Sequence, residues 1–129
     1  MKITRSELVE AMNGLTALGQ RQMPNVIGYK LFVLRKKLKP FAAAYNEGHA
    51  ALVQEHRLMK DGQVVWLNPE ELDFSKRLMA WKDTEAWDAA IKAYLEEEID
   101  VGDLDKLTAS ELGPELPPVI MYQLGPLLA

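Results

Sequence analysis

The sequence predicts a mainly helical protein, at most α+β, in which a long kinked helix packs against two further helices and carries a small β-ribbon. Three observations support this fold class. An apolar ladder in steps of four and three residues runs through the middle of the chain, as on one face of a helix. A second stretch with helical spacing follows residue 83. Between them stands Asp61-Gly62, a dipeptide typical of a tight hairpin turn.

The first helix is predicted to begin at Thr4. Thr4 and Glu7 have the spacing of a capping box, in which a hydroxyl and a carboxylate accept hydrogen bonds from free backbone N–H groups at the helix start. One apolar face follows, formed by Leu8, Ala11, Met12, Leu15 and Leu18. Gly19 favours a helix end, and a short connector leads to the next element.

The long helix is predicted from Asn25, a capping residue, to about Arg57. Its ladder consists of Ile27, Leu31, Leu34, Leu38, Phe41, Tyr45, Gly48 and Leu52. Pro40 lies inside this stretch and removes one backbone hydrogen bond, which kinks or divides a helix. Because the ladder keeps its phase across Pro40, we expect one kinked helix rather than two.

Minor β structure and a short helical segment are expected next. The short arms around Asp61-Gly62 predict a hairpin or a loose ribbon. Residues 68–71 (NPEE) predict a turn that opens a helical segment, with Phe74, Leu78 and Trp81 as its buried face. Further on, Ile99 and Val101 alternate with acidic residues, as in a short strand.

The third helix is predicted to start at a cap formed by Asp83 or Thr84 and to pack antiparallel to the long helix. Its apolar stripe consists of Trp87, Ala90, Ile91, Tyr94 and Leu95. Later, Pro117-Pro118 opens a last apolar turn or two. We expect this apolar carboxyl-terminal segment to pack into the core or into a subunit interface.

Length and composition fit one domain that spans residues 1–129. The chain has no cysteine, which excludes disulfides, thiolate metal sites and cysteine nucleophiles. No segment approaches the roughly 20 apolar residues of a membrane-spanning helix. No signal peptide is apparent at the amino terminus, so we expect no membrane association and a cytoplasmic location.

Charge is distributed unevenly along the chain. Residues 1–60 hold ten Lys or Arg against four Asp or Glu, whereas residues 61–129 hold five against fifteen. The favoured explanation is that the two halves fold against each other and neutralise part of this charge. The alternative is that the polarity serves a function.

Two charged groups are the candidate partner contacts. The basic group on the long helix consists of Arg35, Lys36, Lys37 and Lys39, with Lys30 shortly before it. The acidic group at the end of the third helix consists of Glu96, Glu97 and Asp100. Carboxylates at the carboxyl end of a helix are disfavoured by the helix dipole, which indicates that basic groups offset them.

No pattern of residues predicts catalysis or metal binding. His49 and His56 are seven residues apart, about 10 Å along a helix, which is too far for both to bind one metal ion. Ser6, Ser75 and Ser110 lie outside any strand-turn-helix nucleophile elbow. We therefore expect a protein that is not an enzyme and needs no metal or cofactor.

The order of several segments is informative. A leucine-rich first helix precedes residues 23–31 (MPNVIGYKL), and a glycine-containing turn, an acidic-tailed helix over residues 94–101 and a leucine-rich, proline-containing end come later. This order resembles a family of small uncharacterised phage and prophage proteins. The chain departs from that pattern at Pro40 and between Trp66 and Trp81, where it is longer. The resemblance implies a phage setting, in the host cytoplasm or the virion.

Three functions follow as hypotheses. The leading one is a non-enzymatic phage protein that binds a host or defence protein through charged helix faces. The first alternative is a virion or assembly component, a homo-oligomer in which the ladder and the apolar end contact copies of the same chain. The second, a nucleic-acid-binding regulator, is disfavoured because the net charge is −4 and aromatic residues are not interleaved with the bases.

Overall fold

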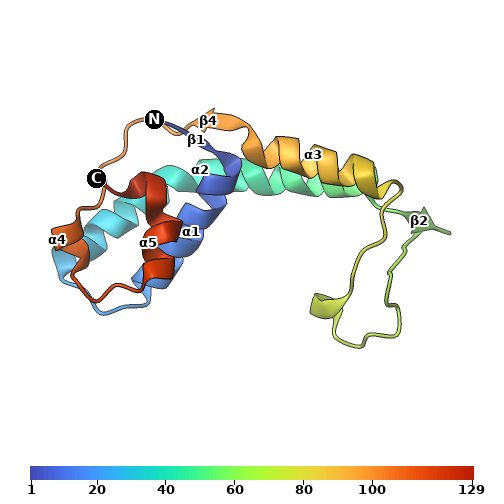
Figure 1. Cartoon of the computed structure of the whole chain (residues 1–129), viewed down its shortest axis with the longest axis horizontal. Helices are drawn as coiled ribbons and strands as arrows, with labels where there is room; N and C mark the ends of the chain where they lie inside the picture. The colour runs from blue at the N-terminus through green and yellow to red at the C-terminus, as the bar shows by residue number, and fades with distance from the viewer. The chain divides into compact units, whose positions relative to one another are not determined.

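The computed structural model describes every residue from Met1 to Ala129 and confirms the mainly helical fold class, with two small antiparallel sheets (Figure 1). In chain order the elements are β1 (Lys2–Thr4), α1 (Arg5–Gly19), α2 (Asn25–His56), β2 (Met59–Lys60), β3 (Gln63–Val64), the 3₁₀ turn η1 (Phe74–Lys76), α3 (Thr84–Glu96), β4 (Glu98–Asp100), α4 (Ala109–Leu112), α5 (Pro118–Leu124) and the 3₁₀ turn η2 (Gly125–Leu127).

The chain folds into two compact units. The first unit contains Met1–Tyr45 and Leu95–Ala129, and the second contains Asn46–Tyr94. The sequence predicts one domain over residues 1–129, and the packing resolves two units within that span. Each unit is described by itself below.

The capping box predicted at the start of α1 is confirmed. The Thr4 hydroxyl accepts a hydrogen bond from the Glu7 backbone N–H at 3.0 Å, and the Glu7 carboxylate accepts one from the Thr4 N–H at 3.0 Å. The buried face of α1 consists of Leu8, Ala11, Gly14, Leu15 and Leu18. Met12 is only partly buried, and the helix ends at Gly19, where the sequence predicts its end.

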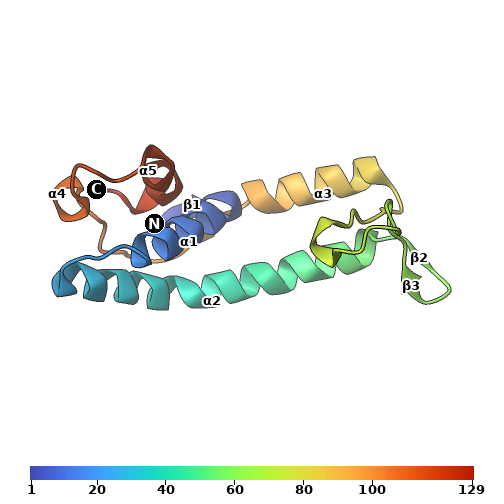
Figure 2. The ribbon, with the colours of Figure 1, turned by 90° about the horizontal axis from the view of Figure 1, so that it is seen from below.

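Helix α2 runs without interruption from Asn25 to His56 and includes Pro40 (Figure 2). The prediction of one helix rather than two is therefore confirmed. Pro40 is exposed, and so is Lys36, whose carbonyl would have accepted the hydrogen bond that proline lacks. Water can satisfy that carbonyl at the surface. The buried ladder side chains of α2 are Ile27, Leu31, Leu34 and Leu38.

The core of the first unit joins segments from both ends of the chain. β1 pairs antiparallel with β4, and Ile3 lies opposite Ile99. α5 packs so closely on α1 that a Cβ atom at Gly14 would lie 3.1 Å from the Leu124 side chain. The core consists of Ile3, Leu8, Ala11, Leu15, Leu18, Leu31, Leu34, Leu38, Val101, Leu107, Leu112, Ile120, Leu124 and Leu127. The apolar carboxyl-terminal segment thus packs into the core of its own chain.

In the second unit, α3 packs antiparallel to the last part of α2, as predicted. The ring of His56 lies 5.9 Å from that of Trp87, centroid to centroid. A Cβ atom at Gly48 would lie 2.9 Å from Cζ of Tyr94. A later residue of α2 thus contacts an earlier residue of α3, so the two helices run in opposite directions. Gly48 occupies a ladder position without a side chain because the Tyr94 ring fills that space.

The hairpin predicted at Asp61-Gly62 is also confirmed. β2 pairs antiparallel with β3. Asp61 and Gly62 have φ angles of 52° and 76°. Two successive positive φ angles define a type I′ turn, which matches the twist of short antiparallel strands and favours Asp-Gly.

The helical segment predicted after Asn68 is wrong. Residues 66–81 form an irregular loop in which η1 is the only helical turn. Phe74 and Leu78, predicted to be buried, are 69% and 60% exposed. The Asn68 side chain crosses the loop and bonds the Lys76 carbonyl at 3.1 Å and the Leu78 N–H at 2.7 Å. Polar groups therefore occupy the inside of the loop, and the apolar side chains lie outside.

The three tryptophans of the second unit are only partly buried, including Trp81, which was predicted on a buried face, and Trp87, which was predicted on an apolar stripe. Trp81 and Trp87 stack with ring centroids 3.9 Å apart and an interplanar angle of 10°. Trp66 contacts Phe74 edge to face at 6.4 Å. Ala80 is the one buried apolar residue of this unit. Aromatic stacking, rather than a closed core, thus joins its segments.

Candidate functional site

The side of α2 opposite its buried ladder carries a group of exposed apolar and basic side chains. We define the α2 outer face by Val26, Tyr29, Phe32, Val33, Lys36 and Lys39, all within the first unit. Val26, Tyr29 and Phe32 are 78%, 70% and 59% exposed. Residues three and four apart are neighbours on a helix surface, so these side chains form one continuous stripe.

Two shallow grooves flank the α2 outer face. The first has a volume of about 490 Å³ and is lined by Val26, Tyr29, Lys30, Val33, Leu34, Lys37, Asp105 and Glu111. The second has a volume of about 450 Å³ and is lined by Met12, Phe32, Arg35, Lys36 and Lys39. The aromatic and basic side chains thus form a ridge between two hollows, a shape that offers a partner both a protrusion and recesses.

Lys30 is bonded within the chain and is not available to a partner. Its Nζ donates hydrogen bonds to the two carboxylate oxygens of Glu111 at 2.9 and 3.2 Å and lies 3.6 Å from Asp105. Together with the backbone N–H of Thr108, the Lys30 ammonium lowers the pKa of Glu111 to about 2. The hydrogen bond to Glu111 in turn raises the pKa of Lys30.

Arg35 and Lys37, two residues of the predicted basic group, also have partners inside the first unit. Arg35 Nη2 donates a hydrogen bond to the Leu15 carbonyl at 2.9 Å. This places a cation near the carboxyl end of α1, where the helix dipole favours it. Lys37 Nζ reaches the Asp103 carbonyl at 3.5 Å, the outer limit of a hydrogen bond. Arg35 therefore serves the fold, and Lys37 is weakly held.

Lys36 and Lys39 are the remaining members of the predicted basic group. Both are exposed, and neither has a hydrogen bond or an ion pair within the chain. They lie on the α2 outer face, one and two turns beyond Phe32. The structure thus leaves these two cations free beside the exposed aromatic side chains.

The predicted acidic group is mostly engaged with the amino-terminal segment. Glu97 pairs with Arg5 at 3.0 Å. Asp100 lies 3.3 Å from the ammonium of Met1, and it accepts a hydrogen bond from the Gly102 N–H at 2.9 Å, which lowers the pKa of Asp100. Glu96 is exposed. These pairs, like Lys30 with Glu111, support the explanation that the two halves of the chain neutralise each other.

Sequence reasoning missed the apolar members of the α2 outer face. Val26, Tyr29 and Phe32 fall between ladder positions, so this part of α2 has more large apolar residues than one buried face accommodates. This surplus of large apolar residues is the sequence feature that indicates a second, exposed apolar face on α2. The expectation that aromatic residues are not interleaved with the bases is wrong for the folded helix, because Tyr29 and Phe32 lie on the same side as Lys36.

The fold and this surface define the class of the molecule: a mainly α protein with an exposed aromatic and basic helix face. No group of three or more His, Asp or Glu side chains is placed to hold a metal ion. None of the helices has the length and apolar character needed to cross a bilayer. Comparisons with protein-family models, curated proteins and solved structures gave no match.

Proposed function

We propose that this protein is a non-enzymatic binding protein that recognises an apolar and acidic patch on another protein through the α2 outer face. The observation that carries the proposal is the exposure of Val26, Tyr29 and Phe32 on a helix whose other side is well packed. Single exposed apolar residues are common, whereas several in one stripe mark an interaction surface.

The chemistry of the α2 outer face fits a protein partner. Aromatic side chains at the centre of an interface supply most of its binding energy, since they bury a large area and lose little conformational entropy. Tyr29 and Phe32 occupy that central place. Lys36 and Lys39 border them and favour a partner with carboxylates at the matching positions, which contributes specificity and association rate.

A protein partner is favoured over a nucleic acid by the number of free cations. Affinity for nucleic acids grows with the number of phosphates that Lys and Arg neutralise. On this part of α2, Lys30 is paired with Glu111 and Arg35 is bonded to Leu15, which leaves Lys36 and Lys39 with the weakly held Lys37. Two or three cations support little phosphate binding, so the apolar stripe dominates the surface.

The biological setting we propose rests on the resemblance of the sequence to small phage and prophage proteins. In that setting the partner is a host or defence protein, and binding takes place in the host cytoplasm. A virion or assembly role is the second proposal. In that role, the α2 outer face would bind an apolar and acidic patch on a phage structural protein.

The test is a pull-down from the lysate of infected host cells with tagged variants of the whole chain. Three double variants are compared with the parent: Tyr29→Ala with Phe32→Ala, Lys36→Glu with Lys39→Glu, and Lys60→Glu with Lys106→Glu. The last is the control, because Lys60 and Lys106 are exposed and lie outside the α2 outer face. Circular dichroism establishes that all variants fold.

We expect a stoichiometric protein partner that the parent and the control retain, that the aromatic variant loses, and that the lysine variant holds at least 10-fold more weakly. Recovery of phage structural proteins under the same pattern supports the assembly role. A partner held equally by all four proteins contradicts the proposal. So does binding to nucleic acid alone that falls steeply with salt.

A further inference from the structure

The loop over residues 66–81 presents apolar side chains on a hydrogen-bonded frame. Leu67, Leu72, Phe74 and Leu78 are 68%, 91%, 69% and 60% exposed. Ala80, near the end of the same loop, is the one buried residue of the second unit. The loop therefore leaves four large apolar side chains mostly in contact with water.

The frame of the loop is held by hydrogen bonds. The Leu67 N–H donates to the Leu78 carbonyl at 2.7 Å, and the Asn68 side chain bonds the Lys76 carbonyl and the Leu78 N–H across the loop. The Asp73 carboxylate caps η1 by accepting from the Ser75 N–H at 3.0 Å, a bond that with the Ser75 hydroxyl lowers the pKa of Asp73. These bonds fix the loop before any partner arrives, which reduces the entropic cost of binding.

Arg77 supports the outer side of the loop. Its Nε donates to the Glu71 carbonyl at 2.7 Å, and its guanidinium lies 4.1 Å from the centroid of the Phe74 ring. It also lies 5.8 Å from the Trp66 ring. Phe74 thus contacts the Arg77 cation and the Trp66 ring, and its side chain is still 69% exposed.

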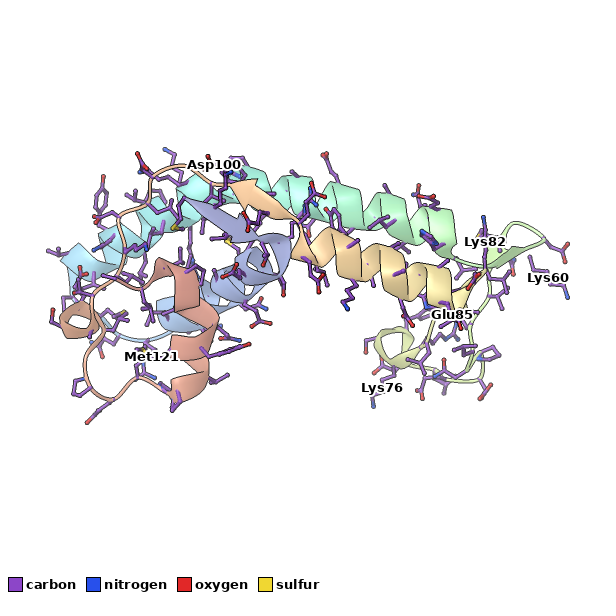
Figure 3. All side chains as sticks on the ribbon, turned by 45° about the horizontal axis from the view of Figure 1, so that its top comes forward. Lys60, Lys76, Lys82, Glu85, Asp100 and Met121 are labelled. Carbon is purple, nitrogen blue, oxygen red and sulfur yellow. The ribbon has the colours of Figure 1, made fainter.

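The charges at the edge of the loop indicate the occupant. Glu70 and Lys76 are exposed, lie on either side of Leu72 and Phe74 in the sequence, and have no ion-pair partner in the chain. Lys76 stands on η1 at the edge of the loop (Figure 3). An acidic partner surface would be repelled by Glu70, and a basic partner surface would be repelled by Lys76. In a dimer with a two-fold axis, Lys76 of each copy can lie against Glu70 of the other copy.

We infer that the loop over residues 66–81 is a self-association surface, through which two copies of this chain form a two-fold dimer. The apolar centre is Leu72 and Phe74, and the borders are Glu70 and Lys76. Such a contact is isologous, so the same residues act on both sides. It lies outside the α2 outer face and is independent of the function proposed above.

The test is sedimentation equilibrium of the whole chain over micromolar to millimolar concentrations. We expect a monomer–dimer equilibrium in the parent. Leu72→Asp is expected to weaken it by about 100-fold, because it places a charge in the apolar centre. Leu72 is 91% exposed, so this change leaves the fold intact. The control, Tyr29→Ala with Phe32→Ala, is expected to dimerise like the parent.

Charge exchange tests the two-fold arrangement. Glu70→Lys alone and Lys76→Glu alone are each expected to weaken the dimer by about 10-fold, since like charges then face each other. An equimolar mixture of the two variants is expected to restore it, as a heterodimer. A monomer at every concentration overturns the inference, and so does a dimer that Leu72→Asp leaves intact or that the Tyr29 and Phe32 control abolishes.

Discussion

Lys30 on α2 and Glu111 on α4 form an ion pair at 2.9 Å across 81 residues of sequence. The side chains are only 17% and 23% exposed, whereas Glu97 and Asp100 are mostly exposed in their ion pairs. Glu111 also completes the capping box of α4 by accepting from the Thr108 N–H at 2.9 Å. One carboxylate thus fixes the start of α4 and attaches it to α2.

This pair predicts a loss of stability in acid. The pKa of Glu111 is lowered from 4.5 to about 2 in the folded chain, so its stabilising contribution is complete above about pH 4.5 and is lost as the pH falls towards 2. Glu111→Gln keeps an N3 residue suited to the capping box but removes the charge. We expect this variant to lose that part of the pH dependence, as measured by chemical unfolding between pH 2 and pH 5.

The exposed residue Glu115 provides the control for that experiment. Glu115→Gln is expected to leave the pH dependence of unfolding as it is in the parent chain. If Glu111→Gln and Glu115→Gln give the same profile, the Lys30 pair does not govern acid stability.

Gly48 is predicted to be intolerant of a side chain. In Gly48→Ala the new Cβ would lie 2.9 Å from Cζ of Tyr94, and overpacking of this kind costs about 1–3 kcal/mol. Gly28→Ala is the matched control, because a Cβ there would meet no atom of a packed neighbour within 4 Å and alanine stabilises the helix by about 0.5–1 kcal/mol. Thermal unfolding is expected to shift in opposite directions, and a shift in the same direction contradicts the contact.

Gly19 and Arg35 are predicted to be coupled. A Cβ at Gly19 would lie 2.8 Å from Arg35 Nη2 and would displace the guanidinium from the Leu15 carbonyl. Gly19→Ala is expected to cost about 1 kcal/mol in the parent and much less in an Arg35→Met background, as in a double-mutant cycle. Equal costs in the two backgrounds, measured by urea unfolding, would show that the residues act independently.

Leu124 is predicted to be essential to the first unit. It is fully buried, and Leu124→Ala is expected to lower the free energy of unfolding by about 2–5 kcal/mol. Val119 lies on the same helix but is 61% exposed, and Val119→Ala is expected to change stability by less than about 0.5 kcal/mol. A small effect at Leu124 would be inconsistent with the packing of α5 on α1.

The elements governed by local chemistry are those that the sequence predicts well. The capping box at Thr4, the hairpin at Asp61-Gly62 and the ladder of α2 depend on residues close together in the chain, so their patterns are readable. β1 was not predicted, because its pairing with β4 joins positions nearly a hundred residues apart. The three residues Lys2, Ile3 and Thr4 alternate polar and apolar, but three residues are too few for the pattern to indicate a strand.

The candidate site was only partly predictable. The sequence indicates that Lys36 and Lys39 face solvent. It cannot show that Lys30 donates a hydrogen bond to Glu111 or that Arg35 donates one to the Leu15 carbonyl. Those bonds depend on tertiary packing. The helical segment predicted within residues 66–81 is wrong for a related reason, because the Asn68 side chain bonds across the loop and its apolar side chains face outward.

The first unit is assembled from Met1–Tyr45 and Leu95–Ala129, and this has a consequence for synthesis on the ribosome. The leucines of α1 and α2 emerge early, but Leu107, Leu124 and Leu127, which complete their core, emerge last. Until then the nascent chain exposes an apolar surface that invites chaperones or aggregation. Codon changes that slow translation between residues 46 and 94 are therefore expected to lower the yield of folded protein.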